Sequence, residues 1–313
     1  MEQNLDFLAG KRIMITGGGG YLGSKLAQRL SSANTHIALL DIRFNWLSED
    51  LTKSNYLITK HLVDITNRDQ LEVVCQKVKP DYVFHFSALL DRERDFGIFN
   101  KLFEVNVKGT LNLLESLRSV NYERLFFSST SEVYGTKNPV PFHEEQLPNP
   151  ASPYSLTKLM AENTIVSYSD LHHRPYTILR LFNFFGTDMP ENFFINQLIT
   201  SLKQDQEFKM TKGEQSRDFL EITDLIDSIL AITKTDKSNS ETINICSGKG
   251  LLLRELATEV AQKLKKEHLL KIGAIPYREN EVWAMVGSNQ KFCKITNHPQ
   301  EDTVLGITKH IFA

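Results

Sequence analysis

Short apolar runs alternate along the chain with longer stretches whose apolar positions recur at helical spacing. The apolar runs at 12–15, 36–40, 57–63, 82–86, 124–128, 176–181 and 242–246 predict strands. Helices are predicted at 67–78, 98–117 and 154–171, and another begins at about residue 22. Strands that alternate with helices build parallel sheets. The pattern therefore predicts an α/β fold with a doubly wound parallel sheet of the Rossmann type.

The alternation becomes irregular beyond Asn183 and returns with the strand at 242–246. No low-complexity linker separates the two patterns. We therefore expect a larger domain of residues 1–182 plus about 223–248, interleaved with a smaller C-terminal lobe of about 183–222 plus 249–313.

A glycine-rich run links the first strand to the first helix. It reads Thr16-Gly17-Gly18-Gly19-Gly20-Tyr21-Leu22-Gly23. In a strand–loop–helix context, Gly17 suits a tight turn, Gly20 a close approach of pyrophosphate, and Gly23 close packing of the helix. The helix N-terminus directs unpaired N–H groups at the phosphates. Four glycines alone could form a flexible turn, but the flanking elements favour a dinucleotide site.

Asp41 ends the second strand, about twenty residues beyond the glycines, where an acid binds the ribose hydroxyls of a dinucleotide. Its carboxylate would repel a 2′-phosphate, so NAD(H) is favoured over NADP. The next residues, Ile42 and Arg43, adjoin the same site, and Arg43 could instead accommodate that phosphate. The alternative is that Asp41 is a turn residue.

Composition restricts the partners and the compartment. The 313 residues carry a net charge of −2 and no long basic run, so we expect no nucleic-acid partner. No apolar run approaches the length of a membrane-spanning helix, and no signal peptide precedes the first strand. Three widely spaced cysteines indicate neither a metal site nor a disulfide framework. We expect a cytoplasmic protein without metal or membrane attachment.

Candidate chemistry follows the strand at 124–128. Thr130 lies in a hydroxyl-rich loop, and Tyr154 precedes Lys158 by four residues at the start of a predicted helix. Residues four apart share a helix face, and an ammonium favours a neighbouring phenolate. Tyr154 could then remove a proton from an oxygen that Thr130 holds by a hydrogen bond. The alternatives are an ordinary surface pair on a helix, or Glu132 as the base.

With these motifs, the chain resembles the extended short-chain dehydrogenases/reductases, in the branch of NAD-dependent nucleotide-sugar epimerases and dehydratases. The matching segments are 16–23, Asp41, Asp64, 85–88, 106–110, 128–135, 152–158, 180–186 and 213–219. They follow one another in order over most of the chain.

The resemblance implies roles for further residues and a nucleotide-diphosphate sugar as substrate, bound by the smaller lobe. Along the cofactor it implies Asp64 and Ile65 at the adenine, then Phe86, Ser87, Ala88, Asn106, Ser128 and Leu181. Asn106 would also support a proton relay through Lys158. At the substrate it implies Thr130, Ser131, Asn183, Arg217 and Arg278, the last of these in a sequence that departs from the family's usual Arg-Pro-Gly-Asp. For Arg217 and Arg278 the alternative is a solvated surface charge. Arg92 and Arg94 either face the sugar or are surface charges.

The reaction after hydride removal is less defined. Related 4,6-dehydratases usually carry Thr-Asp-Glu where this chain has Thr130-Ser131-Glu132, so the aspartate for dehydration is absent. We therefore expect oxidation at C4 of a hexose or heptose, in a 4-dehydrogenase or 4-epimerase. The alternatives are a 4-ketoreductase, a 4,6-dehydratase, a decarboxylase, or a relative that binds dinucleotide without catalysis. Residues 275–283 resemble bacterial enzymes for deoxysugars and heptoses of surface glycans. The resemblance also implies a homodimer formed through the helices at 98–117 and 154–171.

Overall fold

The computed structural model describes residues 4–48, 51, 57–91, 93–190, 193–278 and 281–297. Contacts between Cα atoms divide the chain into two compact units. The first comprises Met1–Gly135, Pro148–Arg180 and Leu230–Ile243, and the second comprises Thr136–Leu147, Leu181–Ile229 and Asn244–Ala313. The sequence pattern gave no sign that Thr136–Leu147 belongs to the second unit. This segment is held there because Asn244 donates a hydrogen bond to the carbonyl oxygen of Phe142.

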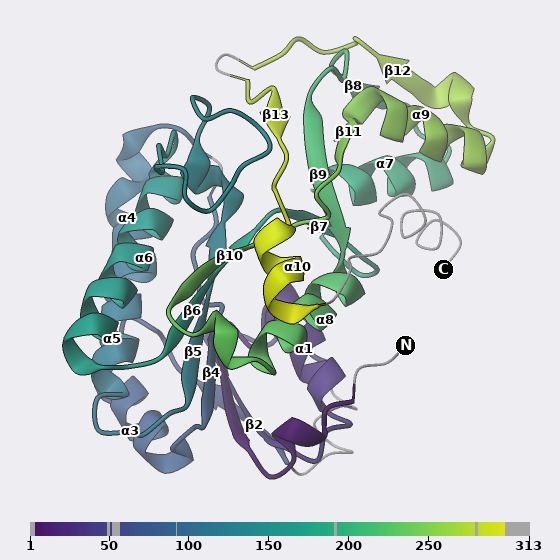
Figure 1. The fold of residues 1–313 in the computed structure, drawn as a ribbon. Coiled ribbons are helices and arrows are strands. Elements are labelled where there is room, and N and C mark those ends of the chain that lie inside the picture. Colours follow the sequence, from purple (N-terminus) through teal and green to yellow (C-terminus); the bar gives the residue numbers. More distant parts are fainter. Residues whose placement is uncertain are drawn as a thin grey trace. The chain divides into compact units, whose positions relative to one another are not determined.

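The first unit is built on a seven-stranded sheet (Figure 1) with the order β10-β6-β5-β4-β1-β2-β3. Its strands are β1 (Arg12–Thr16), β2 (His36–Asp41), β3 (Ile58–Leu62), β4 (Tyr82–His85), β5 (Arg124–Thr130), β6 (Tyr176–Leu181) and β10 (Glu241–Ile245). The pairings of β1 with β2 and β4, of β2 with β3 and of β4 with β5 are all parallel. The order reverses between β1 and β4, so the predicted doubly wound, Rossmann-type fold is confirmed.

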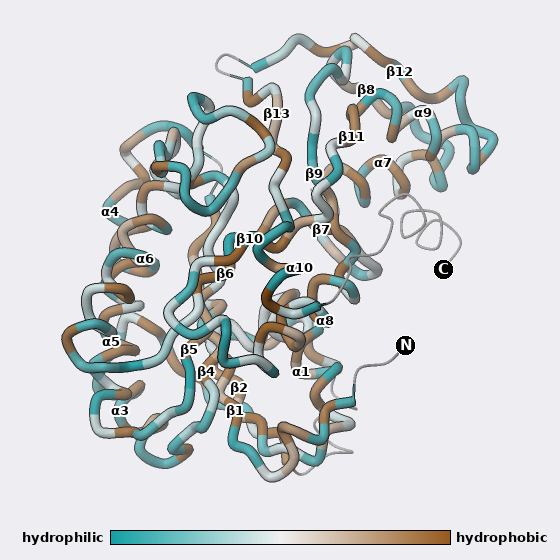
Figure 2. The backbone as a smooth tube through the Cα atoms, viewed as in Figure 1, coloured by the Kyte–Doolittle hydropathy of each residue, from teal (hydrophilic) through white to brown (hydrophobic). Residues whose placement is uncertain are grey.

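Helices cover this sheet on both faces (Figure 1). They are α1 (Tyr21–Leu30), α3 (Arg68–Val78), α4 (Phe99–Phe103), α5 (Gly109–Ser116) and α6 (Pro153–His172). In Figure 1, α3 to α6 form one layer, in which α5 packs against both α3 and α6. Figure 2 shows hydrophobic colouring along the sheet strands. The burial pattern agrees, because every residue of β4 and β6 is buried.

The helix predicted at 98–117 is interrupted. A π-helical turn, Glu104–Lys108, separates α4 from α5. Such wide turns insert an extra residue and are frequent at functional sites. Asn106 lies in this turn with 2% of its surface exposed, and its side chain makes hydrogen bonds outside the helix. Apolar periodicity cannot reveal the insertion, because residues on either side keep helical spacing.

The second unit contains shorter elements. Its strands are β7 (Asn183–Phe185), β8 (Phe208–Met210), β9 (Ser216–Glu221), β11 (Gly250–Leu252), β12 (Leu270–Ile272) and β13 (Ala284–Met285). Its helices are α7 (Phe194–Lys203), α9 (Leu253–Leu264), α10 (Gln290–Thr296) and most of α8 (Ile222–Thr233). α7 packs against α9 over a separate apolar core. No helix among the described residues is long and apolar enough to cross a membrane.

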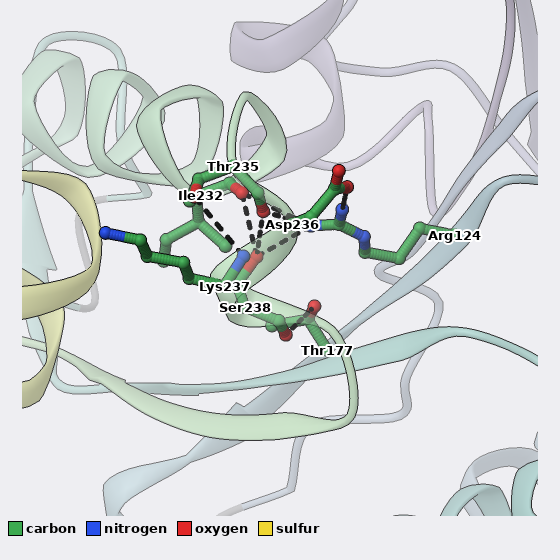
Figure 3. A network of polar contacts seen from close by, with 7 residues as sticks. All are labelled: Arg124, Thr177, Ile232, Thr235, Asp236, Lys237 and Ser238. Carbon is green, nitrogen blue, oxygen red and sulfur yellow. Dashed lines mark hydrogen bonds and ion pairs between the residues drawn. The ribbon is translucent and has the colours of Figure 1, made fainter.

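Arg124 fastens the end of α8 within the first unit (Figure 3). Its Nη1 donates to the carbonyl oxygens of Thr235 and Ile232 at 2.9 and 3.4 Å, and to Ser238 Oγ at 2.6 Å. The last carbonyl groups of a helix lack partners within it, and a cation is favourable at this end. Arg124 Nη2 also pairs with Asp236 at 2.9 Å, although the Asp236 side chain is 96% exposed.

We expect Arg124→Met to lower the free energy of unfolding by about 2–3 kcal/mol, because hydrogen bonds from a buried cation to backbone carbonyls are lost. Asp236→Asn is the matched control and should cost less than about 1 kcal/mol, since an exposed ion pair contributes little. Denaturant unfolding of both variants measures the difference. Equal costs would show that the ion pair, and not the capping of α8, stabilises this corner.

Candidate functional site

The glycine loop is shaped by close backbone contacts within the first unit. Gly17 has φ +72°, and a Cβ there would lie 2.7 Å from the carbonyl carbon of Phe86. A Cβ on Gly19 would lie 1.8 Å from the carbonyl oxygen of Arg43, so Gly19 is required although the motif spacing passed over it. Gly20 is the N-cap residue of α1 and offers no side-chain acceptor to the first turn, an arrangement that suits a bound anion.

Asp41 braces the same loop from the end of β2. Its Oδ2 accepts a hydrogen bond from Gly19 N at 3.0 Å, and its Oδ1 accepts one from Ile42 N at 2.7 Å. Oδ1 also accepts a hydrogen bond from Arg43 N at 3.3 Å, whereas Oδ2 keeps acceptor capacity for a second donor. Asp41 can therefore hold the loop and still accept a ribose hydroxyl.

A cavity of about 470 Å³ opens beside this loop. The predicted residues that line it are Gly17, Gly20, Asp41, Ile42, Arg43, Asp64, Ile65, Phe86, Ser87 and Ala88. Six lining residues were missed besides Gly19, namely Asn45, Trp46, Val63, Leu89, Lys101 and Val105. Tyr21 and Leu22 lie in the first turn of α1, where the Tyr21 ring meets Trp46 edge to face at 5.9 Å. Gly23 lies one residue further on, where a Cβ would meet Gly17 O at 2.3 Å.

Behind the loop, a buried row of side chains joins three elements. Thr16 Oγ1 lies 2.7 Å from His85 Nδ1, and His85 Nε2 lies 2.9 Å from Thr110 Oγ1. Burial, together with the smaller effect of the charge of Lys158, lowers the pKa of His85 to about 3, so the ring is neutral. The row therefore fixes the end of β1 against α5 without adding a charge.

Asn106 ties the loop after β4 to α6. Its Oδ1 accepts from Leu89 N at 2.8 Å, while its Nδ2 donates to Leu89 O and to Thr157 Oγ1, each at 3.1 Å. Thr157 immediately precedes Lys158. These contacts place Asn106 beside the lysine, and its part in a proton relay stays a prediction.

Thr130 ends β5, and its Oγ1 accepts a hydrogen bond from Glu132 N at 3.2 Å. With one lone pair held, the hydroxyl hydrogen can point to another acceptor. Glu132 is half-buried and accepts from Ser152 Oγ at 3.5 Å, next to the start of α6. Ser131 is buried, and Ser128 Oγ donates to His85 O at 3.3 Å. The hydroxyl-rich loop thus lies beside the N-terminus of α6.

Tyr154 and Lys158 occupy the first turns of α6. Ser152 and Ser155 cap this helix reciprocally, and the positive end of its dipole favours an anion in the first turn. Tyr154 is half-buried, whereas Lys158 is 1% exposed, with its Nζ 4.0 Å from the centroid of the Phe127 ring. Burial lowers the pKa of Lys158 to about 7, partly offset by the negative charge of Glu162. Lys158 is therefore no ordinary surface lysine.

The remaining candidates belong to the second unit, in which Leu181 is the first residue of the segment Leu181–Ile229. Asn183 Nδ2 donates a hydrogen bond to Asp218 O at 3.2 Å. Arg217 Nη2 pairs with Glu281 Oε1 at 3.2 Å, and both side chains are mostly buried. Arg217 is thus not a solvated surface charge, and its partner was not foreseen. Arg278 is exposed.

Asp218 fixes the strand that carries Arg217. Its side chain accepts hydrogen bonds from Ser247 N and Oγ, Gly248 N and Gly287 N at 2.6–3.3 Å. Burial raises the pKa of Asp218 to about 6 against these donors. This carboxylate joins three segments of the second unit.

All cofactor candidates except Leu181 belong to the first unit, as do Thr130 at the end of β5, Glu132, and Tyr154 and Lys158 in the first turns of α6. Asn183, Arg217 and Arg278 are placed in the second unit, and Leu181 is the last residue of β6. Arg94 is exposed, and Arg92 lies outside the described residues. Among those residues, no group of three or more His, Cys, Asp or Glu is placed to hold a metal ion.

The comparison with protein families decides the identity. The model described as "NAD dependent epimerase/dehydratase family" matches residues 13–246, about three quarters of the chain. The chain belongs to the NAD-dependent epimerase/dehydratase family. It is an enzyme family of the extended short-chain dehydrogenase/reductase type, and its cofactor is NAD.

Members of this family with different activities are similar to the chain. A GDP-6-deoxy-D-talose 4-dehydrogenase of Aggregatibacter actinomycetemcomitans is 25% identical, over 91% of this chain and 90% of the relative. A UDP-N-acetyl-alpha-D-glucosaminuronate decarboxylase of Bacillus cytotoxicus is 31% identical, over 80% of each. The structure of WbmG from Bordetella bronchiseptica with NAD and UDP superposes with a TM-score of 0.84 at 21% identity, over 97% of this chain and 94% of that one.

The residues of the first unit fit NAD. The uncapped start of α1 suits a pyrophosphate, and two carboxylates, Asp41 and Asp64, line the cavity beside it. Its volume of about 470 Å³ is typical of a cofactor site.

We expect Asp41→Asn to weaken NAD binding about tenfold or more and to strengthen NADP binding, which narrows the preference for NAD. Asparagine removes the charge but keeps an oxygen for Gly19 N. Asp41→Ala is the control that also removes this brace, and it should weaken both cofactors. Calorimetry gives both affinities. Tighter binding of NADP than of NAD by the unaltered protein would contradict the assignment.

Lys158→Met should stabilise the fold at about pH 6, and the gain should vanish towards about pH 10. The folded chain releases the Lys158 proton at a pKa of about 7, whereas the unfolded chain keeps it to 10.5. The free energy of unfolding contributed by Lys158 therefore rises with pH between these values. Denaturant unfolding across this range measures it, with the exposed Lys234→Met as control. A pH-independent difference would show that the lysine is not buried in its charged form.

Proposed function

We propose that the protein is an NAD-dependent oxidoreductase that acts at C4 of a nucleotide-diphosphate sugar, as a 4-dehydrogenase or 4-epimerase. The observation that carries the proposal is the burial of Lys158 one helical turn from the half-buried Tyr154, in the same unit as the glycine loop. A buried lysine with a perturbed pKa is costly for the fold and typical of a catalytic site.

Each residue of the first unit then has a chemical role. Tyr154 accepts the proton of the C4 hydroxyl while the C4–H bond breaks. Thr130 donates a hydrogen bond to the same oxygen and holds it in line. Lys158 and the N-terminus of α6 stabilise the phenolate of Tyr154 by charge. NAD, when bound, supplies the acceptor for the hydride.

The substrate residues of the second unit complete the proposal. Arg217 presents a planar guanidinium suited to a diphosphate, and Asn183 and Arg278 are the further candidates. Both the 4-dehydrogenase and the decarboxylase reported above act on nucleotide-linked sugars, which supports this substrate class.

Decarboxylation is the second candidate reaction. The most identical of the relatives named above is a decarboxylase, and the Thr130-Ser131-Glu132 run is compatible with one. In that case the sugar carries a carboxylate at C6, and oxidation at C4 precedes the loss of CO₂. The two candidate reactions share oxidation at C4 and differ in whether the sugar carries a C6 carboxylate that is then lost as CO₂.

Assembly as a homodimer stays a prediction. Leu102, Leu113 and Leu117, which recur at helical spacing in 98–117, are each fully buried within the first unit. They belong to its core and offer no surface to a second copy. An interface on these helices would use other side chains.

We expect Tyr154→Phe to reduce turnover by about a hundredfold to ten-thousandfold, the usual worth of general base catalysis. The ring is kept, so NAD binding should survive, and the rise of turnover with pH should disappear. Thr130→Val should cost less, because it removes a positioning hydrogen bond and leaves the base. Steady-state kinetics and calorimetry on both variants give the comparison. Near-normal turnover of the Phe variant would exclude Tyr154 and make Glu132 the leading base.

A further inference from the structure

A buried ion pair lies next to the proposed catalytic residues and takes no part in the steps above. Glu162 and Arg180 are 3% and 5% exposed. Arg180 Nη2 and Nε donate to the two oxygens of Glu162 at 2.8 and 3.1 Å, and Ser129 Oγ donates a further short hydrogen bond to Oε1. A buried ion pair is weak as a source of stability, because two charges lose their hydration. Its presence here calls for another explanation.

The pair links three elements of the site. Ser129 immediately precedes Thr130 on β5, Glu162 follows Lys158 by four residues on α6, and Arg180 lies on β6. The guanidinium carbon of Arg180 is also 4.8 Å from the centroid of the Tyr134 ring, in the loop after β5. The carboxylate of Glu162 is therefore held in one place from two strands.

The groups around Lys158 differ in the charge they offer. Phe127 of β5 presents a ring face, and His85 of β4 is neutral with both ring nitrogens in hydrogen bonds. Tyr154 lies one turn away on α6. Glu162 lies one turn away on the other side, and its negative charge opposes the effect of burial on the lysine. Arg180 competes for the same carboxylate.

We propose that Glu162 is a positioning residue that supplies the counter-charge of the Lys158 ammonium. Arg180 and Ser129 then fix the Glu162 carboxylate, and the positive charge of Arg180 weakens its effect on Lys158. The inference rests on the proposed function of Lys158 beside Tyr154. It assigns the ion pair the task of setting the pH range in which the lysine is charged.

Lys158 itself reports on this proposal. In the full chain without substrate, NMR of labelled lysine side chains follows the titration of Lys158, identified by its loss in Lys158→Met. Glu162→Gln should lower the pKa of Lys158 by about one unit or more, the usual effect of one nearby charge. Arg180→Gln keeps an amide donor but removes the competing cation, so it should raise that pKa. Ser129→Ala, which changes no charge, is the matched control and should shift it little.

The opposite signs separate charge from damage, because a loosened site would move both variants in the same direction. Shifts of equal sign, or no shift in Glu162→Gln, would overturn the proposal. If Glu162→Gln does not fold, the double variant Glu162→Gln/Arg180→Gln leaves no unpaired buried charge and should still lower the pKa of Lys158.

Turnover distinguishes this inference from the proposed function. In Glu162→Gln, Lys158 loses its charge at a lower pH and stabilises the phenolate of Tyr154 less. The pH at which turnover rises should therefore move upward. A shifted Lys158 titration with an unchanged pH–rate profile would leave the ion pair's role intact and contradict the role given to Lys158.

Discussion

The site depends on keeping one ammonium group charged in the core of the first unit. Lys158 is 1% exposed and sits over the ring of Phe127, where water cannot stabilise its charge. Burial alone drives such a group towards its neutral form. The charge of Glu162 opposes this tendency. The buried charge lowers the stability of the fold, and in the proposed mechanism it stabilises the phenolate of Tyr154, one helical turn away.

The parallel sheet explains why these groups meet. Residues that end β1, β2, β4 and β5 lie at one edge, where doubly wound sheets bind ligands. Gly17 and Asp41 follow β1 and end β2 on the cofactor side, and Thr130 ends β5 on the chemical side. The π-helical turn lets Asn106 reach both Leu89 and Thr157, so the loop after β4 and the helix with Lys158 are fastened together.

The sequence alone predicted the seven strands of the parallel sheet, the glycine loop and the order Thr130, Tyr154, Lys158, because local periodicity and fixed spacing encode these features. The six short strands of the second unit were not predicted. Gly19 could not be assigned, since its need arises from the backbone of Arg43, which arrives from another part of the chain. The pairing of Arg217 with Glu281 could not be predicted either, because the two residues lie far apart in the sequence. The interrupted helix at 104–108 keeps its apolar spacing, so only the backbone hydrogen bonds reveal it.

Oxidation at C4 is common to the candidate reactions, so its detection tests the account most directly. A panel of nucleotide sugars, each with and without deuterium at C4, would be incubated with the purified protein and NAD while NADH absorbance and product mass are followed. The account predicts one substrate whose turnover is slowed by deuterium at C4, with a two-hydrogen loss for a dehydrogenase, a CO₂ loss for a decarboxylase, or no mass change for an epimerase. Turnover of a nucleotide sugar that is insensitive to deuterium at C4, or conversion of none of them, would contradict it.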